Sequence, residues 1–189
     1  MPHIPVSPTS IRENLPYRPN VGAMIFDKRG RVFIARRADI QANIRKNANL
    51  KNTDLDTEKE IWQCPQGGID EGEEAKDAVI REIFEEINTR QVQILGEHPE
   101  WISYDLPAHL IGIALGGQYR GQRQKWFALL YTGDNSDIRL DTQPYQEFDA
   151  WMWIDFPSLP YHKVGFKKPI YERLVRDFAC YAQQGYKYL

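Results

Sequence analysis

The sequence predicts an α/β fold in which a mixed β-sheet lies between helices. Short segments with the composition of β-strands outnumber the helical segments, and a run of strands separates the two helical segments. The chain also has no internal repeat. Because a sheet and a helix must each bury an apolar face, this order of elements favours a layered α/β sandwich.

The first predicted element is a β-hairpin over residues 20–36. It begins with the largely apolar run NVGAMIFD, turns at KRG and continues with the alternating run RVFIAR. Residues 1–16 lack periodicity, so we expect an irregular arm before a single domain over residues 17–189. Residues 38–60 are polar, contain four asparagines and are long for a connection within a compact domain, which predicts an insertion.

The next elements are a strand, a loop and a helix. A buried strand is predicted at Ile61–Cys64, and Pro65 ends it. A loop containing Gly67 and Gly68 follows. Residues 74–87 contain good helix formers and no Pro or Gly, and apolar side chains recur at every fourth position, which predicts a helix. The later elements are expected as strands at 91–96, 100–105, 124–132 and 148–154, and as a helix at 169–183.

The composition excludes several function classes. The formal net charge of −2 does not favour whole-surface binding of nucleic acid, so phosphate contacts require a local basic patch. Two cysteines, Cys64 and Cys180, are too few for a disulfide framework or a zinc site. No apolar run reaches the roughly 18–20 residues of a membrane span, and residues 1–16 have no apolar core of a secretory signal. We expect a soluble, cytoplasmic protein that binds neither membranes nor DNA.

The strongest chemical signal is an acidic cluster on the predicted helix at 74–87. Glu82, Glu85 and Glu86 are spaced i, i+3 and i+4, so they share one helix face. Three adjacent carboxylates repel one another unless a cation lies between them, and hard divalent ions such as Mg²⁺ prefer these oxygen ligands. The alternative is a solvated acidic face on which Arg81 pairs within its own helix.

The loop before this helix favours the metal site. Gly67 and Gly68 allow a tight turn and a close approach of the backbone to a metal or a phosphate. Glu73 lies in the first turn, where the positive end of a helix favours a carboxylate. Arg81 can reach Glu73 or Glu85 and hold the acidic side chains in one rotamer.

The segment GGIDEGEEAKDAVIREIFEEINT resembles the Nudix box, whose pattern is G-x5-E-x7-R-E-U-x-E-E-x-G-U. Asn88 stands at the glycine position and Thr89 at the last aliphatic position; asparagine is the next best residue for the left-handed conformation that ends a helix. The chain is similar to the Nudix branch of bacterial RNA 5′-pyrophosphohydrolases and of bacterial and plant dinucleoside tetraphosphate hydrolases. The residues that carry this wider likeness are 17–22, 36–37, 62–68, 122–127, 147–151 and 164–167.

The resemblance implies a Nudix-type α/β/α sandwich and a hydrolase that uses Mg²⁺, with Mn²⁺ as a substitute. The implied catalytic residues and metal ligands are Glu82, Glu85, Glu86 and Glu147, with the backbone of Gly67 as a further ligand. Gly68, Glu73 and Arg81 support the motif. The implied substrate-binding residues are Arg18, Arg37, Gln124, Lys125, Phe166 and Lys167, of which Phe166 occupies the position that stacks on a base.

Three functions stay open from the sequence. The first is an RNA pyrophosphohydrolase that removes pyrophosphate from a 5′-triphosphate end and leaves a 5′-monophosphate. The second is a dinucleoside tetraphosphate hydrolase, and the third is a catalytically silent Nudix binding module, against which the complete glutamate set argues. Tyr104 could stack on a base or pack in the core, whereas Trp126 and Phe127 are expected in the core and Lys168 on the surface. The sequence indicates no protein partner.

Overall fold

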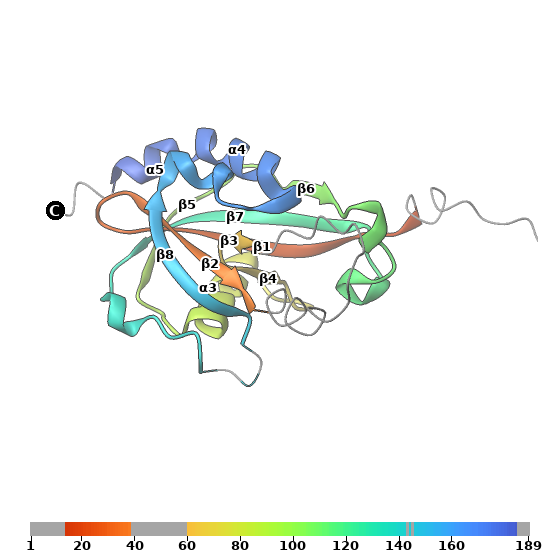
Figure 1. Ribbon diagram of the computed structural model, residues 1–189, viewed down its shortest axis with the longest axis horizontal. Helices are drawn as coiled ribbons and strands as arrows, with labels where there is room; N and C mark the ends of the chain where they lie inside the picture. Colours follow the sequence, from red (N-terminus) through yellow and green to blue (C-terminus); the bar gives the residue numbers. More distant parts are fainter. Residues whose placement is uncertain (1–13, 39–59, 143, 145, 185–189) are drawn as a thin grey trace, which may run out of the picture.

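A computed structural model describes residues 14–38, 60–142, 144 and 146–184 (Figure 1). The predictions for residues 1–13 and for 39–59, which make up most of the expected arm and insertion, lie outside the described residues. Within the described part, no helix is both long and apolar enough to cross a membrane.

One mixed β-sheet forms the centre of the protein (Figure 1). Its strands are β1 (Tyr17–Phe26), β2 (Arg31–Arg37), β3 (Trp62–Gln63), β4 (Gln66–Gly68), β5 (Val92–Glu97), β6 (Ile102–Asp105), β7 (Gly121–Tyr131) and β8 (Phe148–Asp155). The order along the main path is β3-β2-β1-β7-β5, while β4 pairs with β1, β6 with β7 and β8 with β2. The central pair, β1 and β7, is parallel, and the other pairs are antiparallel.

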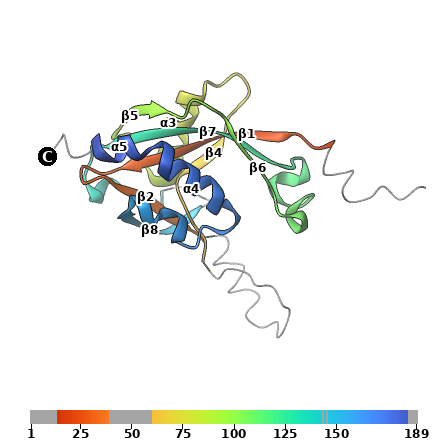
Figure 2. The same cartoon turned by 90° about the horizontal axis from the view of Figure 1, so that it is seen from above.

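Helices cover both faces of this sheet (Figures 1 and 2). They are α3 (Ala75–Ile87), α4 (Lys168–Asp177) and α5 (Ala179–Gln184). The described chain also contains the 3₁₀ helices η1 (Ala108–Leu110), η2 (Ala114–Gly117), η3 (Asn135–Asp137), η4 (Phe156–Tyr161) and η5 (Gly165–Lys167). The fully buried side chains form one cluster between α3 and the sheet and another between α4 and the opposite face. The predicted α/β/α sandwich is therefore confirmed.

Two local predictions are wrong. Residues 66–68 are not a loop but the short strand β4, in which Gln66, Gly67 and Gly68 pair with Gly22, Val21 and Asn20 of β1. This pairing is made by the backbone, so the glycines carry no side-chain pattern that would predict it. The last helical segment is not continuous either, because α4 ends where the buried ring of Phe178 packs against His98 and Tyr181.

Candidate active site

Helix α3 presents its carboxylates along the border between its buried and exposed faces. Its apolar stripe, which includes Val79 and Ile83, is buried against the sheet. Glu86 lies next to this stripe and is also buried, whereas Glu85 is exposed. The helix ends at Asn88, whose φ of 56° is left-handed and whose N–H donates to the Phe84 carbonyl at 2.9 Å. The expectation for Asn88 is therefore confirmed.

Arg81 joins the helix to β4 and to the loop between them. Its Nε and one terminal nitrogen each donate to Glu73 at 2.8 Å, and it also donates to the carbonyl of Gly68 at 2.8 Å. The other terminal nitrogen donates to Glu82 at 2.9 Å and to Glu85 at 3.2 Å. The hydrogen bonds from Arg81 lower the pKa of Glu73 to about 2. One guanidinium thus holds three carboxylates in place.

The two glycines of β4 lie directly under charged side chains. A Cβ at Gly67 would lie 1.9 Å from the carboxyl carbon of Glu82, and one at Gly68 would lie 2.3 Å from a terminal nitrogen of Arg18. Real Cβ atoms never approach this closely, so any larger residue would displace the charged group. The absence of a side chain at these positions is what lets Glu82 and Arg18 pack against the strand.

Glu86 is the most buried carboxylate of the site. The backbone N–H of Gln66 donates to its Oε2 at 3.1 Å, while its Oε1 has no hydrogen-bond partner among the described residues. Burial, followed by the negative charges of Glu147 and Glu82, raises the pKa of Glu86 well above its usual range. Burial also raises the pKa of Glu82. The site therefore holds carboxylates whose negative charge is poorly compensated.

Glu147 comes from a different part of the chain. It precedes β8, and its carbonyl accepts the N–H of Ala38 at 2.8 Å, where β2 ends. A cavity of about 540 Å³ lies between this residue and α3. Its lining residues are Arg81, Glu82, Phe84, Glu85, Glu86, Arg90, Pro144 and Glu147. The sequence-predicted acidic residues therefore meet at one cavity.

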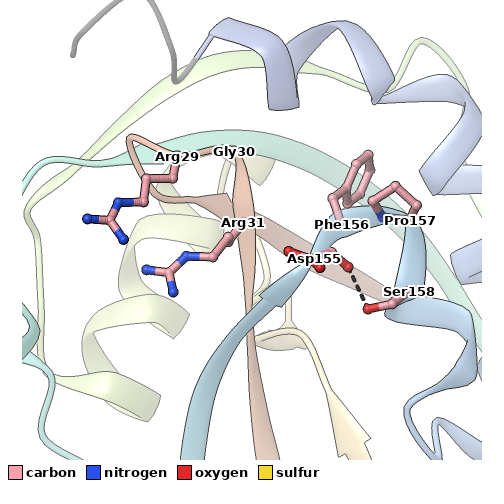
Figure 3. Close-up of a pocket in the computed structure, with 7 residues that line it drawn as sticks. All are labelled: Arg29, Gly30, Arg31, Asp155, Phe156, Pro157 and Ser158. Atoms are coloured by element: carbon pink, nitrogen blue, oxygen red, sulfur yellow. Dashed lines mark hydrogen bonds between the residues drawn. The ribbon is translucent and has the colours of Figure 1, made fainter.

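A second cavity of about 430 Å³ lies at the other end of β8 (Figure 3). There Arg29 and Arg31 come from the hairpin between β1 and β2, and Ser158 Oγ donates to the Asp155 carbonyl at 2.7 Å. Arg31 is held by Asp27 in an ion pair of 2.7 Å. None of the predicted site residues lines this cavity.

Cationic side chains flank the acidic group. Lys167 is buried, and its Nζ donates to Gln63 Oε1 at 3.0 Å. Burial and the charge of Arg37 lower the pKa of Lys167 to about 7, while Glu147 and Glu86 oppose the shift. Arg37 lies at the end of β2, opposite the first residue of β8. Lys167, Arg37, Glu86 and Glu147 are thus electrostatic neighbours.

An aromatic pair lies beside these cations. The ring of Phe166 is 42% exposed, and its centroid is 5.6 Å from that of Tyr104. Lys167 Nζ lies 5.9 Å from the Tyr104 ring. Burial raises the pKa of Tyr104, against the opposing charges of Arg37 and Arg18. Tyr104, which the sequence left undecided, therefore belongs to this group.

Two predicted substrate-binding residues are placed differently. Lys125 Nζ donates to the His98 carbonyl at 2.7 Å and forms an ion pair with Glu97, the last residue of β5, at 3.3 Å. The positive charge of Lys125 is therefore already paired. Gln124 is fully buried and is hydrogen-bonded to other amides. The structure does not bring Lys125 to the acidic group.

Sequence reasoning gave no role to a group of buried amides below the site. Their signal in the sequence was that all of them lie in the segments 17–22, 62–68 and 122–127, which carry the family resemblance. The side chains are Asn20, Gln63, Gln66 and Gln122.

The donor set suits a hard divalent cation. Glu86 Oε1 is a buried acceptor without a partner, and carboxylate oxygens are the ligands such ions prefer. However, within the described residues no three His, Cys, Asp or Glu side chains are arranged closely enough to hold a metal ion. Glu82 and Glu85 are hydrogen-bonded to Arg81 instead. Metal binding would therefore need these carboxylates to move closer together.

Comparison with known proteins identifies the family. The family model described as "NUDIX domain" matches residues 16–174. The chain belongs to the Nudix family. Members of this family, the Nudix hydrolases, generally use divalent metal ions, which agrees with the carboxylate donors of this site.

Curated Nudix relatives cover almost the whole chain. The RNA pyrophosphohydrolase of Gluconacetobacter diazotrophicus is 55% identical over 170 residues, which are 90% of this chain and 96% of that protein. The RNA pyrophosphohydrolase of Gluconobacter oxydans is 48% identical over 89% of each chain.

Solved structures of the same fold are more distant in sequence. The E. coli dihydroneopterin triphosphate pyrophosphohydrolase aligns with a TM-score of 0.60 at 20% identity, over 87% of this chain and 98% of that one. A C. elegans Ap4A hydrolase aligns with a TM-score of 0.56 at 17% identity, over 88% of this chain and 98% of that one. These likenesses establish the Nudix fold.

Proposed function

We infer that this chain is a Nudix hydrolase that acts as an RNA pyrophosphohydrolase. The observation that carries the inference is the 55% identity to a curated RNA pyrophosphohydrolase over 90% of this chain. In this reaction water adds to a phosphorus, a phosphoanhydride P–O bond breaks, pyrophosphate leaves, and the RNA keeps a 5′-monophosphate.

The acidic group is the proposed metal site. Glu82, Glu85, Glu86 and Glu147, with the backbone of Gly67, would hold Mg²⁺, for which Mn²⁺ can substitute. A bound dication neutralises polyphosphate charge and lowers the pKa of a bound water, which makes that water a nucleophile at neutral pH. The buried, unpartnered Oε1 of Glu86 and the charge of Glu147 beside it support this assignment.

The remaining residues bind and orient the substrate. Lys167, Arg37 and Arg18 would bind phosphate oxygens, since they surround Tyr104 at the border of the acidic group. Phe166, half exposed beside Tyr104, would stack on a base. Arg81 would hold Glu82 and Glu85 until the metal arrives. Every proposed contact to a base is sequence-tolerant, which suits a substrate defined by its phosphorylated end.

Cytoplasmic action is part of this proposal. Cys64 is buried and Cys180 exposed, and both are free thiols, as is usual in a reducing compartment.

The test compares two substrates with Mg²⁺ present: 5′-triphosphorylated RNA and diadenosine tetraphosphate. We expect kcat/KM to favour the RNA by about a hundredfold or more, which corresponds to about 2.7 kcal/mol. The opposite preference would make the chain a dinucleoside polyphosphate hydrolase. Cleavage of neither substrate would indicate a catalytically silent binding module. The Glu82→Gln variant, assayed in parallel, gives the background rate of an inactive protein.

A further inference from the structure

A chain of buried hydrogen bonds below the site has a fixed direction. The indole N–H of Trp126, which can only donate, donates to Gln124 Oε1 at 3.2 Å. Gln124 must therefore use its Nε2 on the other side, and this nitrogen donates to Gln66 Oε1 at 2.8 Å. Gln66 Nε2 in turn donates to Gln63 Oε1 at 2.9 Å. The indole thus fixes the orientation of three amides in sequence.

Lys167 confirms this direction from the opposite end. Its Nζ donates to the same Gln63 Oε1 at 3.0 Å, so this oxygen accepts two hydrogen bonds. The planar amide then leaves Gln63 Nε2 as a donor, and exchanging its oxygen and nitrogen would break both bonds.

Gln63 Nε2 has no hydrogen-bond partner among the described residues, although the side chain is only 1% exposed. A buried N–H without an acceptor destabilises the folded protein, and such groups in native structures call for an explanation. In the described part of the chain, the other buried side-chain nitrogen or oxygen without a partner is Glu86 Oε1, and it does not accept from Gln63. An acceptor supplied from outside the protein would account for the free donor.

The position of Gln63 indicates which acceptor that is. Through Lys167 it touches the cationic side of the site, and through Gln66 it is connected to Glu86, because the Gln66 backbone N–H binds that carboxylate at 3.1 Å. The positive charges of Lys167 and Arg37 beside this point favour an acceptor that is negatively charged. Phosphate oxygens are acceptors of this kind.

We propose that the Nε2–H of Gln63 binds a phosphate oxygen of the substrate's polyphosphate beside Lys167. This inference rests on the proposed function only in that the substrate carries a polyphosphate. Gln63 supplies a neutral donor whose direction is set before the substrate arrives.

The test is Gln63→Glu, which has nearly the same shape. It keeps an oxygen that accepts from Lys167 and Gln66, but replaces the free donor with a second oxygen. We expect the Kd for inorganic tripolyphosphate with Mg²⁺, measured by calorimetry, to rise about tenfold or more, which equals about 1.4 kcal/mol. Gln63→Met, which removes the donor without adding charge, should weaken binding in the same direction. Gln93→Glu, on an exposed face of β5, is the matched control.

A second measurement separates direct binding from an effect through Lys167. In a Lys167→Met background, Gln63→Met should still raise the Kd, because the lost donor contacts phosphate itself. An unchanged Kd in that background would make Gln63 a positioning residue for Lys167 and would overturn the proposal. An unchanged Kd in both single variants, with wild-type circular dichroism, would overturn it as well. Since tripolyphosphate contains no nucleoside, these outcomes are independent of whether RNA is the substrate.

Discussion

Among single residues, Glu86 carries the largest conflict between stability and function. Its carboxylate is buried, it faces the charges of Glu147 and Glu82, and one of its oxygens has no partner. Burying an uncompensated charge destabilises a folded protein, and proteins retain such groups where activity requires them.

Replacing Glu86 by glutamine should therefore stabilise the metal-free protein while it abolishes turnover. Because the folded-state pKa of Glu86 is raised above its unfolded value, the contribution of the protonated side chain to the free energy of unfolding is fully present below the unfolded pKa. It is lost as pH rises through the folded pKa. In EDTA above that pKa, Glu86→Gln should raise the thermal midpoint by at least about 2 °C. The pH dependence of the midpoint should also become flatter, and a lower midpoint for the variant at every pH would contradict this.

Lys125 is expected to act on stability rather than on substrate binding. Its ammonium is bound to the His98 carbonyl and to Glu97. Lys125→Met should leave KM within about twofold of wild type and lower the free energy of unfolding by about 1 kcal/mol. Arg37→Ala, measured in parallel, should raise KM instead. A large KM increase for Lys125→Met without loss of stability would restore it to the phosphate-binding set.

At the scale of elements, helix α3 is held by its apolar stripe, by Arg81 at its middle and by the cap at its C-terminal end. Arg81 connects it to the preceding loop through Glu73, and Asn88 ends it in the left-handed conformation. The ends matter for the site because Glu85 and Glu86 lie in the last turn. Fraying of that turn would release the carboxylates from their positions.

Substitutions at Asn88 should separate backbone strain from side-chain chemistry. Asn88→Ala places an ordinary residue at a positive φ and should lower the free energy of unfolding by about 1 kcal/mol. Asn88→Gly, the matched control, should change it by only a few tenths of a kcal/mol, since glycine adopts this conformation without strain. Urea denaturation measures both values. Equal stability of the two variants would show that the left-handed conformation is not what this position requires.

Across the whole molecule, the two helical layers are connected to the site by different routes. Helix α3 provides carboxylates directly, whereas α4 on the opposite face contacts the segment that leads to β4 (Figures 1 and 2). The hydroxyl of Tyr171 in α4 accepts the N–H of Cys64 at 3.0 Å, and both residues are fully buried. This hydrogen bond connects α4 to the backbone segment that leads from Gln63 to Gly67.

Tyr171→Phe should weaken that connection between layers. The buried Cys64 N–H loses its acceptor, so the free energy of unfolding should fall by about 1–3 kcal/mol in denaturant titrations. Tyr161→Phe provides the control, because this tyrosine is 76% exposed and its loss of a hydroxyl should be neutral. Equal effects of the two substitutions would show that the buried hydrogen bond contributes nothing.

Residue spacing in the sequence predicted the elements that local interactions determine, above all helix α3. The spacing of Glu82, Glu85 and Glu86 and the apolar stripe beside them placed α3 and its acidic face correctly. Strand β4 was missed because backbone atoms, two of three from glycines, make its pairs. The hydrogen bond from Lys125 to the His98 carbonyl could not be predicted either, because it joins residues that are distant in the sequence.

The amide chain was beyond local prediction for a different reason. Gln63, Gln66 and Gln124 come together only when β4 and β7 have paired with β1. No spacing within one segment encodes the direction of those hydrogen bonds. The tertiary structure is needed to reveal which amide nitrogen is left over.

The parallel pairing of β1 with β7 has a consequence for how this chain folds as it is made. Tyr17 pairs with Gly121 and Phe26 with Leu130. About a hundred further residues must therefore be synthesised after β1 before its parallel partner β7 is available. During synthesis on the ribosome, an apolar strand edge remains open for that interval and can engage other nascent chains. Closing so large a loop also makes folding slow compared with that of a helical protein of equal length.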